Sequence, residues 1–244
     1  AAREPDIEMD IVGAVLHAQD CHLNPGAFMA ALEAALHTMG VRFEWEAAVG
    51  SWRTGAGRVH SVMTTAGQKI EGDEFVLCAG VWSDETARDL ELTLPMQAGR
   101  GYSLTLGETD QRLNACALLT EARVAATPVG QGMRFGGTME ITSKAAPLRP
   151  RRVRGIVRSS CAYFPSLLES DFEGVEAWSG LRPCPPDGLP FLGRTRRWEN
   201  VVVATGHSMM GLSLAPVTGE IVAGLLESVG PAAGPAWLSP DRFK

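Results

Sequence analysis

Residues 200–228 form the part of the sequence whose order of residue types suggests chemistry. An apolar run, "NVVVATG", leads through "GHSMMG" into "LSLAPVTGEIVAGLLES", which has a helical pattern. We expect a buried strand, a glycine-bounded turn and a helix with Pro216 in its first turn, where a missing N–H costs nothing. Free N–H groups near Gly211 and Leu212 then give a helix start that suits an anionic or electron-rich ligand. A strand–turn–helix connection without a ligand fits the pattern equally well.

His207 lies in this turn and is a candidate for acid–base chemistry. A lone histidine is more often a structural residue, because its two nitrogens readily satisfy neighbouring polar groups. The sequence has no Ser–His–Asp spacing, metal-ligand cluster or phosphate-binding loop, and Asp84, Glu140 and Asp187 show no evident pairing. Nothing in the sequence indicates nucleophilic or metal-dependent catalysis.

Arg182 stands in "GLRPCPPDGLPFLG", residues 180–193, among four prolines. Proline fixes φ and removes a backbone donor, so we expect a stiff, exposed loop here and neither a helix interior nor a central strand. The long, flexible side chain of Arg182 is therefore attached to a rigid stretch of backbone. From the residues alone, Arg182 can also simply pack against the carbonyl groups of its own loop.

Composition limits the class of protein. A chain of 244 residues with 45% apolar and 20% charged residues can form a real core, as one large domain or two small ones. A net charge of −6 argues against a general nucleic-acid binder. The charged opening is no signal peptide, and the missing start methionine suggests a cut chain. The scattered cysteines suit reduced thiols in a cytoplasmic protein; they are Cys21, Cys78, Cys116, Cys161 and Cys184.

The first part of the chain predicts a mixture of helices and strands. Residues 24–40 form the clearest helix, with Asn24 as cap, Pro25 at the first position and Gly40 at the exit. An apolar stripe on it, spaced by three and four residues, consists of Phe28, Leu32, Leu36 and Met39. Three further elements are expected: a half-buried strand at 41–49, a hairpin at 57–70 turning near Ala66 and Gly67, and a buried strand at 74–80.

From Leu94 onward the pattern changes to short alternating strands separated by Gly and Pro, which predicts an antiparallel sheet. A helix follows at 150–164, with Val153, Ile156, Val157 and Cys161 on one side. The arginines around it fall on the other faces, which favours a solvated surface over a nucleic-acid site and leaves weak contact with acidic lipid open; they are Arg149, Arg151, Arg152, Arg154 and Arg158. The tail from Pro231 is expected to be loose.

Four segments together resemble the FAD-dependent D-amino acid oxidase superfamily and, within it, the bacterial D-amino acid dehydrogenases. They are "EFVLCAGVWSDETARDLELTLPMQAGRGYSLTL", "MRFGGTME", "GLRPCPPDGLPFLG" and "VVVATGHSMMGLSLAPVTGEIVAGLL". The resemblance implies a mixed α/β and α+β fold, in which a partial FAD-binding domain of the glutathione-reductase type is interleaved with an antiparallel-sheet substrate domain. The implied boundaries are 20–93 and 181–230 for FAD binding, 1–19 and 94–180 for substrate, and 231–244 for a tail.

The activity implied by the resemblance is oxidation of a D-amino acid. Hydride leaves the α-carbon for the flavin, and the imino acid hydrolyses to a keto acid and ammonia. Electrons would pass to a quinone or another acceptor. Two alternatives remain: a relative that acts on glycine or N-methylated amino acids or makes hydrogen cyanide, and a non-catalytic remnant or binding subunit without flavin.

The resemblance also assigns residues. Arg182 would clamp the substrate α-carboxylate through two parallel hydrogen bonds, fixed in orientation by its rigid loop. His207 and Tyr102 complete the implied catalytic set, and Arg100 and Ser208 would lie near the flavin. The implied cofactor-binding residues are Val49, Ala79, Gly80, Trp82, Gly206, Met210, Gly211 and Leu212. N–H groups of the last three would face the pyrimidine edge of the flavin.

One family feature is missing from the sequence. Members begin with a strand–turn–helix carrying GxGxxG and an acidic residue for the ribose, and neither occurs here. We therefore expect a fragment or a degenerate homologue, with roughly 150 residues to be supplied by an N-terminal part or partner subunit. Such a chain alone would bind FAD weakly or not at all, show no turnover and expose sheet edges. We expect a cytoplasmic location with at most peripheral contact with the inner membrane.

Overall fold

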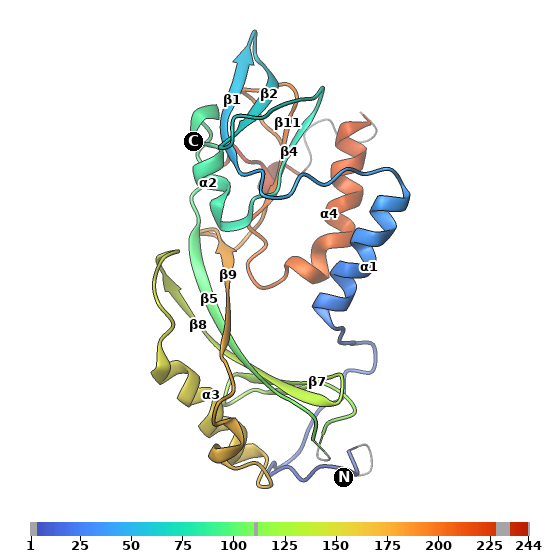
Figure 1. The fold of residues 1–244 in the computed structure, drawn as a ribbon, viewed down its shortest axis with the longest axis vertical. Coiled ribbons are helices and arrows are strands. Elements are labelled where there is room, and N and C mark those ends of the chain that lie inside the picture. Colours follow the sequence, from blue (N-terminus) through green and yellow to red (C-terminus); the bar gives the residue numbers. More distant parts are fainter. Residues whose placement is uncertain (1–3, 110–111, 228–234, 244) are drawn as a thin grey trace. The chain divides into compact units, whose positions relative to one another are not determined.

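The computed structural model describes residues 4–109, 112–227 and 235–243. The chain divides into two compact units (Figure 1). The first unit comprises Ala1–Phe43, Arg100–Glu140 and Ala146–Gly180, and the second comprises Glu44–Gly99, Ile141–Ala145 and Leu181–Lys244. The boundary between residues 180 and 181 separates the two units, as it separates the two expected domains. Residues 20–43, which were expected in the FAD-binding part, belong to the first unit together with most of the expected substrate part. The binding roles of the two parts stay predictions.

A five-stranded sheet dominates the first unit and has the order β6-β7-β8-β5-β9. Its β6–β7 and β7–β8 pairs are antiparallel, as the alternating pattern predicts. The strands are β5 (Gln97–Leu106), β6 (Ala117–Leu119), β7 (Val124–Val129), β8 (Gly132–Thr142) and β9 (Trp178–Cys184). The core of the unit is built around Phe135, whose ring meets Phe164 and Phe172 edge-to-face with ring centroids 5.7 Å apart.

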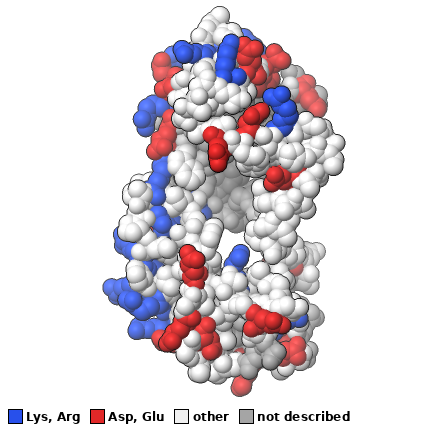
Figure 2. Space-filling view, in the orientation of Figure 1, with Lys and Arg blue, Asp and Glu red and all other residues white. Residues whose placement is uncertain are grey.

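Helix α3 (Pro150–Tyr163) packs against β7 and buries Ile156 and Val157, which confirms the predicted apolar side. Figure 2 shows Lys and Arg atoms gathered over this helix, at the lower left of the view. Arg149 and Arg152 also form ion pairs of 3.2 and 3.1 Å with the buried Glu140, which the pattern alone does not reveal. A 3₁₀ turn, η3 (Glu169–Phe172), follows the helix.

Helix α1 (Pro25–Thr38) has the predicted ends: the Asn24 side chain accepts the N–H of Ala27, and Gly40 adopts a φ of 85°. The strand expected at 41–49 is wrong. The chain turns at residues 45–46, where Glu46 has a left-handed φ of 56°, and the extended conformation begins only at Val49. An alternating pattern requires a neighbouring strand to become a sheet, and this segment has none within the described part of the chain.

Two three-stranded sheets form the second unit. One has the order β1-β2-β3, and its β2–β3 turn includes Gly67 at a φ of 84°, as predicted. The other has the order β10-β11-β4, with β11 antiparallel to β10 and parallel to β4. Helix α4 packs on β10 and β11. The bounds are β1 (Val49–Gly55), β2 (Arg58–Thr64), β3 (Lys69–Glu71), β4 (Phe75–Leu77), β10 (Phe191–Arg194), β11 (Val201–Thr205), α4 (Gly211–Leu226), α2 (Ser83–Thr86), η1 (Gly80–Trp82), η2 (Arg88–Leu90) and η4 (Ala236–Leu238).

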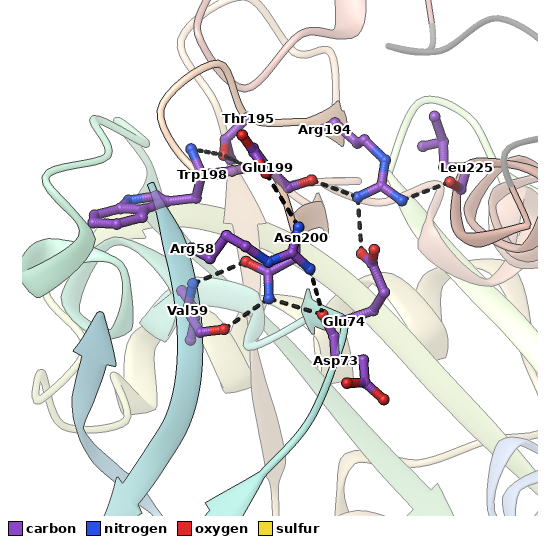
Figure 3. Close-up of polar contacts among 10 residues, drawn as sticks. All are labelled: Arg58, Val59, Asp73, Glu74, Arg194, Thr195, Trp198, Glu199, Asn200 and Leu225. Atoms are coloured by element: carbon purple, nitrogen blue, oxygen red, sulfur yellow. Dashed lines mark hydrogen bonds and ion pairs between the residues drawn. The ribbon is translucent and has the colours of Figure 1, made fainter. Parts of the chain in front are cut away.

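A polar network joins these two sheets (Figure 3). The buried Asn200 amide accepts the Val59 N–H at 2.9 Å and donates to the carbonyls of Val59 and Asp73 at 2.7 and 2.8 Å. Arg194 forms a 2.8 Å ion pair with Glu74 and donates to the Leu225 carbonyl near the end of α4. The network therefore fixes β2, β11 and α4 around the strand β4.

The stretch 180–193 differs from the expected loop. Residues up to Cys184 continue β9, the last strand of its sheet, and β10 begins at Phe191. An outermost strand tolerates Pro183 because one side of its backbone needs no ladder hydrogen bond. Only the residues between these strands form a loop, here named the proline loop (residues 185–190).

Candidate functional site

The carboxyl ends of β4 and β11 form the centre of the candidate site. The two strands are parallel, with Leu77 opposite Val203, so both end at the same edge of the sheet. Thr205 Oγ1 donates to the Gly80 carbonyl at 3.3 Å and accepts the Ser83 hydroxyl at 3.0 Å. The structure thus brings together three of the predicted residues, Ala79, Gly80 and Gly206, at the kind of sheet edge where α/β proteins bind ligands. Trp82, in η1, is 53% exposed beside them.

Two glycines at this edge have a left-handed φ, and the surroundings of Gly206 also leave no room for a side chain. Gly206 has a φ of 81°, and a Cβ on it would stand 2.8 Å from Pro185 Cγ. Gly80 has a φ of 55°, and a Cβ there would meet nothing within 4 Å. Gly206 therefore allows the proline loop to approach the strand end, while the space over Gly80 allows a ligand to approach the backbone. Open backbone of this kind fits a dinucleotide.

Helix α4 begins at Gly211, directly after the turn. The expectation that Pro216 lies in the first turn is wrong: it is the sixth helical residue, so its missing N–H leaves the Leu212 carbonyl without the usual helical donor. The Met210 N–H donates to the His207 carbonyl at 2.9 Å, so the expected set of free donors is reduced to Gly211 and Leu212. No side chain of the described residues caps the helix at Met210. This open N-terminus suits an electron-rich group.

His207 connects the turn to α4. One of its ring nitrogens, Nε2, lies 3.0 Å from Oγ1 of Thr218, a residue of α4 that is 11 positions further along the chain. The ring also lines a hollow of about 350 Å³ over β4, β11 and α4. Burial lowers the pKa of His207 below its ordinary value. These contacts support the structural interpretation of His207, and an acid–base role stays a prediction.

The lowered pKa of His207 gives a pH dependence that can be measured. A histidine whose pKa is lower in the folded state contributes full stability above its unfolded pKa of 6.5, and stability falls as the pH drops through that value. We expect His207→Gln, which keeps an amide for Thr218, to lose less unfolding free energy between pH 7.5 and pH 5.5 than the parent chain. Urea titrations at both pH values measure this, with His60→Gln, at an exposed position of β2, as control. Equal losses in parent and His207→Gln contradict the lowered pKa.

Arg182 lies near the end of β9 and is half-buried. Within the described part of the chain its guanidinium makes no hydrogen bond or ion pair, so packing on its own loop carbonyls is not observed. The next residue, Pro183, accepts the Ser208 N–H at 3.0 Å through its carbonyl. The backbone at Arg182 is therefore hydrogen-bonded to the turn that precedes α4.

A second arginine, which sequence reasoning missed, holds the proline loop. Arg242 pairs with Asp187 at 2.8 Å and donates to the carbonyls of Leu189 and Pro190. Its guanidinium also stacks on Phe191, 4.0 Å from the ring centroid, and it holds the pKa of Asp187 below its usual range. The expectation of a loose tail is wrong for residues 235–243, while 231–234 and 244 lie outside the described residues. No spacing in the sequence connects positions 187 and 242.

Three predicted residues lie elsewhere. Val49 begins β1 and belongs to a different sheet of the second unit. Tyr102 is in the first unit, 2% exposed, and its hydroxyl donates to Glu140. Burial, followed by this hydrogen bond, raises the pKa of Tyr102. Arg100, also in the first unit, is buried and donates to Ser179 Oγ at 3.3 Å. Their roles stay predictions.

A larger hollow, of about 960 Å³, lies on the second unit over residues 91–97 and the start of the proline loop. None of the predicted site residues lines it; its wall includes Cys184, Pro185 and Pro186. We place the candidate site at the strand ends instead, because Gly80, Gly206 and the start of α4 lie there, and Ser208 of the same turn donates to the carbonyl of the residue after Arg182.

Two solved structures have the same fold as this chain. Glycine oxidase from Bacillus cereus ATCC 14579 matches 94% of this chain and 63% of its own, with a TM-score of 0.82 at 22% identity. Glycine oxidase from Geobacillus kaustophilus matches 87% of this chain and 56% of its own, with a TM-score of 0.75 at 25% identity. The chain has the fold of these flavoproteins.

The family follows from the sequence comparison. The family model for DAO, the FAD-dependent oxidoreductases, matches residues 1–225. A D-amino acid dehydrogenase of Rhodopseudomonas palustris (strain HaA2) is 34% identical over 227 residues, 92% of this chain and 52% of the relative. One of Methylobacterium nodulans is 33% identical over 226 residues. The chain belongs to the DAO family of FAD-dependent oxidoreductases. It spans about half the length of the curated relatives it matches.

Proposed function

We propose that this chain forms the substrate-binding and flavin-facing part of an FAD-dependent D-amino acid dehydrogenase, which oxidises a D-amino acid to a keto acid and ammonia. The family and the names of its relatives support the reaction class. The observation that carries the proposal is Arg182, a half-buried guanidinium with no polar partner among the described residues.

An unpartnered guanidinium in this position is best explained by a ligand. Removing a charged group from water is costly unless an opposite charge and hydrogen bonds replace the lost solvation. A carboxylate meets both needs, because its two oxygens match two parallel N–H groups of arginine. The backbone that carries Arg182 is fixed by Pro183, Ser208 and the arginine-braced proline loop, so the α-carboxylate would be held in one orientation.

The residues at the strand ends fit the cofactor of the family. FAD, when bound, accepts the hydride from the substrate α-carbon. Gly80 offers backbone that a dinucleotide can approach, and the N–H groups of Gly211 and Leu212 would stabilise an electron-rich edge of the ring. His207 keeps these donors in place through Thr218. We propose that the chain by itself holds FAD weakly, since these groups bind only part of it.

The remaining partners belong to the same proposal. Electrons would go to a quinone or another acceptor, and the protein would work in the cytoplasm with at most peripheral contact with the inner membrane. Within the described residues, no helix has both the length and the apolar character needed to cross a membrane.

A chimera tests the proposal. The region of the Rhodopseudomonas palustris relative that this chain does not match would be joined covalently to the chain, loaded with FAD and titrated without oxygen. We expect the visible flavin absorbance to bleach with D-alanine and to stay unchanged with L-alanine. A flavin that is bound but bleached by no amino acid contradicts the proposal, and so does a folded chimera that binds no flavin.

A second candidate function acts on a different substrate. The fold match to two glycine oxidases supports a relative that oxidises glycine or N-methylated amino acids. Bleaching with glycine or sarcosine but not with D-alanine would establish this candidate in place of the first. The non-catalytic alternative would correspond to the folded chimera without flavin.

A further inference from the structure

The proline loop has no backbone donor to spare for the rest of the protein. Three of its six residues are prolines, which lack an N–H. The Gly188 N–H donates inside the loop, to the Pro185 carbonyl at 3.2 Å. The Leu189 N–H also stays inside, where it donates to the Asp187 carboxylate at 3.1 Å. The loop therefore has to be held by donors that come from outside it.

Arg242 supplies these donors. Its guanidinium donates to both oxygens of the Asp187 carboxylate, at 2.8 and 3.0 Å, and to the Leu189 and Pro190 carbonyls at 2.6 and 3.2 Å. Among the described residues, every hydrogen bond and ion pair that leaves the loop goes to this side chain. Arginine suits the task because it is always charged and carries five donors in a rigid fork. One side chain thus fixes the position of the loop.

The segment that carries Arg242 is itself attached to the sheet. Leu238 is 5% exposed and packs against β10 and β11. The Asp241 carboxylate accepts the N–H of Arg196, between these two strands in the chain, at 2.8 Å. Strand β11 leads directly into Gly206 and the turn before α4. Arg242 therefore ties the proline loop to the strands that lead to the candidate flavin site.

The position of the loop bears on Arg182, which stands three residues before it. Pro183 accepts the Ser208 N–H at 3.0 Å. Pro185, the first residue of the loop, lies so near Gly206 that a Cβ there would stand 2.8 Å from its Cγ. Since prolines stiffen this short connection, a displaced loop would move the backbone that carries the guanidinium. A displacement of about 1 Å is enough to disturb a paired contact with a ligand.

We propose that Arg242 is a positioning residue for the amino acid carboxylate. By ordering the proline loop it holds the Arg182 guanidinium in the orientation that the carboxylate requires, and it acts through the loop alone. The inference rests on the proposed function. Arg242 lies beyond residues 1–225, which the family model matches, so the family match assigns it no role.

Three substitutions weaken this attachment from its two sides. Arg242→Gln removes both the charge and the fork, whereas Arg242→Lys keeps a charge for Asp187 without the paired donors. Asp187→Asn removes only the charge on the loop and leaves Arg242 stacked on Phe191, so the C-terminal segment keeps its packing. The matched control is Arg197→Gln, which breaks an ion pair of the same 2.8 Å length, with Glu91, that does not involve the loop.

The first measurement needs neither flavin nor substrate. Hydrogen exchange of the full chain, followed by mass spectrometry, compares the peptide of residues 181–193 with the other peptides of the second unit. We expect Arg242→Gln to speed exchange in this peptide about tenfold or more, Arg242→Lys to speed it less, and Arg197→Gln to leave it unchanged. Unchanged exchange in Arg242→Gln would overturn the proposal. An equal rise throughout the second unit would overturn it too, because Arg242 would then be a general stabilising residue.

The second measurement separates positioning from folding. In the chimera described above, the rate of flavin bleaching is followed against the concentration of D-alanine, or of glycine if glycine bleaches the parent instead. We expect Arg242→Gln to raise the half-saturating concentration about tenfold or more and to change the limiting rate by less than about threefold. Arg242→Lys and Asp187→Asn should lie between it and the parent. A loss of folded protein alone would lower only the amplitude of bleaching, and that result would refute the positioning role.

The two measurements keep this inference apart from the proposed function. A parent chimera that no amino acid bleaches contradicts the proposed function and removes the substrate role of Arg242 with it, while the exchange experiment still decides whether Arg242 orders the loop. A bleached parent whose variants keep the half-saturating concentration of the parent contradicts the positioning role and leaves the proposed function in place.

Discussion

Replacing Arg182 with alanine is expected to weaken binding of the amino acid by about 2–5 kcal/mol, a loss of about 30- to 5,000-fold in affinity. The variant removes both N–H donors that would hold the carboxylate and leaves that group without an opposite charge. The dissociation constant is obtained from the dependence of flavin bleaching on D-alanine concentration in the chimera described above. Arg182→Lys, which keeps the charge but not the paired donors, should lie between the parent and the alanine variant.

The same variant should have almost no effect on folding. Since the Arg182 guanidinium makes no polar contact with the described residues, the unfolding free energy of Arg182→Ala should stay within about 0.5 kcal/mol of the parent. An unchanged affinity for D-alanine would refute the carboxylate role. A large loss of stability would show instead that Arg182 holds the fold, in which case the lower affinity would have a structural origin.

The sequence was sufficient for elements that are specified locally. Helix α1 could be placed because Asn24, Pro25 and Gly40 each act within a few residues, through a cap, a fixed φ and a left-handed exit. The hairpin at Gly67 follows the same logic. The antiparallel pairing of β6, β7 and β8 could be expected from alternation alone, since these three strands follow one another in the chain.

The sequence predictions are wrong where residues far apart in the chain determine the local structure. The segment at 41–49 alternates correctly but turns at Glu46, because a strand needs a partner that a local pattern does not reveal. Residues 180–184 contain prolines that suggest a loop, yet the position of β9 at the end of a sheet accommodates them.

The candidate site shows the same division. The pattern predicted the strand, the glycine-bounded turn and the helix that make up residues 200–226, while the binding roles of Gly80, Gly206 and Arg182 came from the family resemblance and stay predictions. The groups that hold the site together could not be found, because they are separated widely in sequence. Arg242 reaches Asp187 across 55 positions, and Thr205 reaches Gly80 across 125. Resemblance to a family supplies roles for such residues, but only the fold supplies their contacts.

Asn200→Ala should be the most destabilising single change in the second unit, with a loss of about 3–5 kcal/mol in unfolding free energy. Asn200 is 1% exposed, and its amide satisfies one N–H and two carbonyl groups from Val59 and Asp73. Alanine removes this partner from the buried N–H and carbonyl of Val59, at roughly 1–3 kcal/mol for each, while the Asp73 carbonyl keeps a hydrogen bond from Arg58 at 3.4 Å. The loss would be a large part of the 5–15 kcal/mol that is typical for a domain, so the variant should unfold at a much lower urea concentration.

Two further variants identify the cause of this loss. Asn200→Asp keeps the shape but places a carboxylate oxygen against the carbonyls of Val59 and Asp73, so it should destabilise at least as much as alanine. Asn24→Ala removes an exposed hydrogen bond at the start of α1 and should cost only about 1 kcal/mol. Urea unfolding followed by tryptophan fluorescence measures all three, because Trp198 is buried two residues from Asn200. If Asn200→Ala costs no more than Asn24→Ala, the buried amide does not hold the two sheets together, and β4 must be positioned by its strand pairing alone.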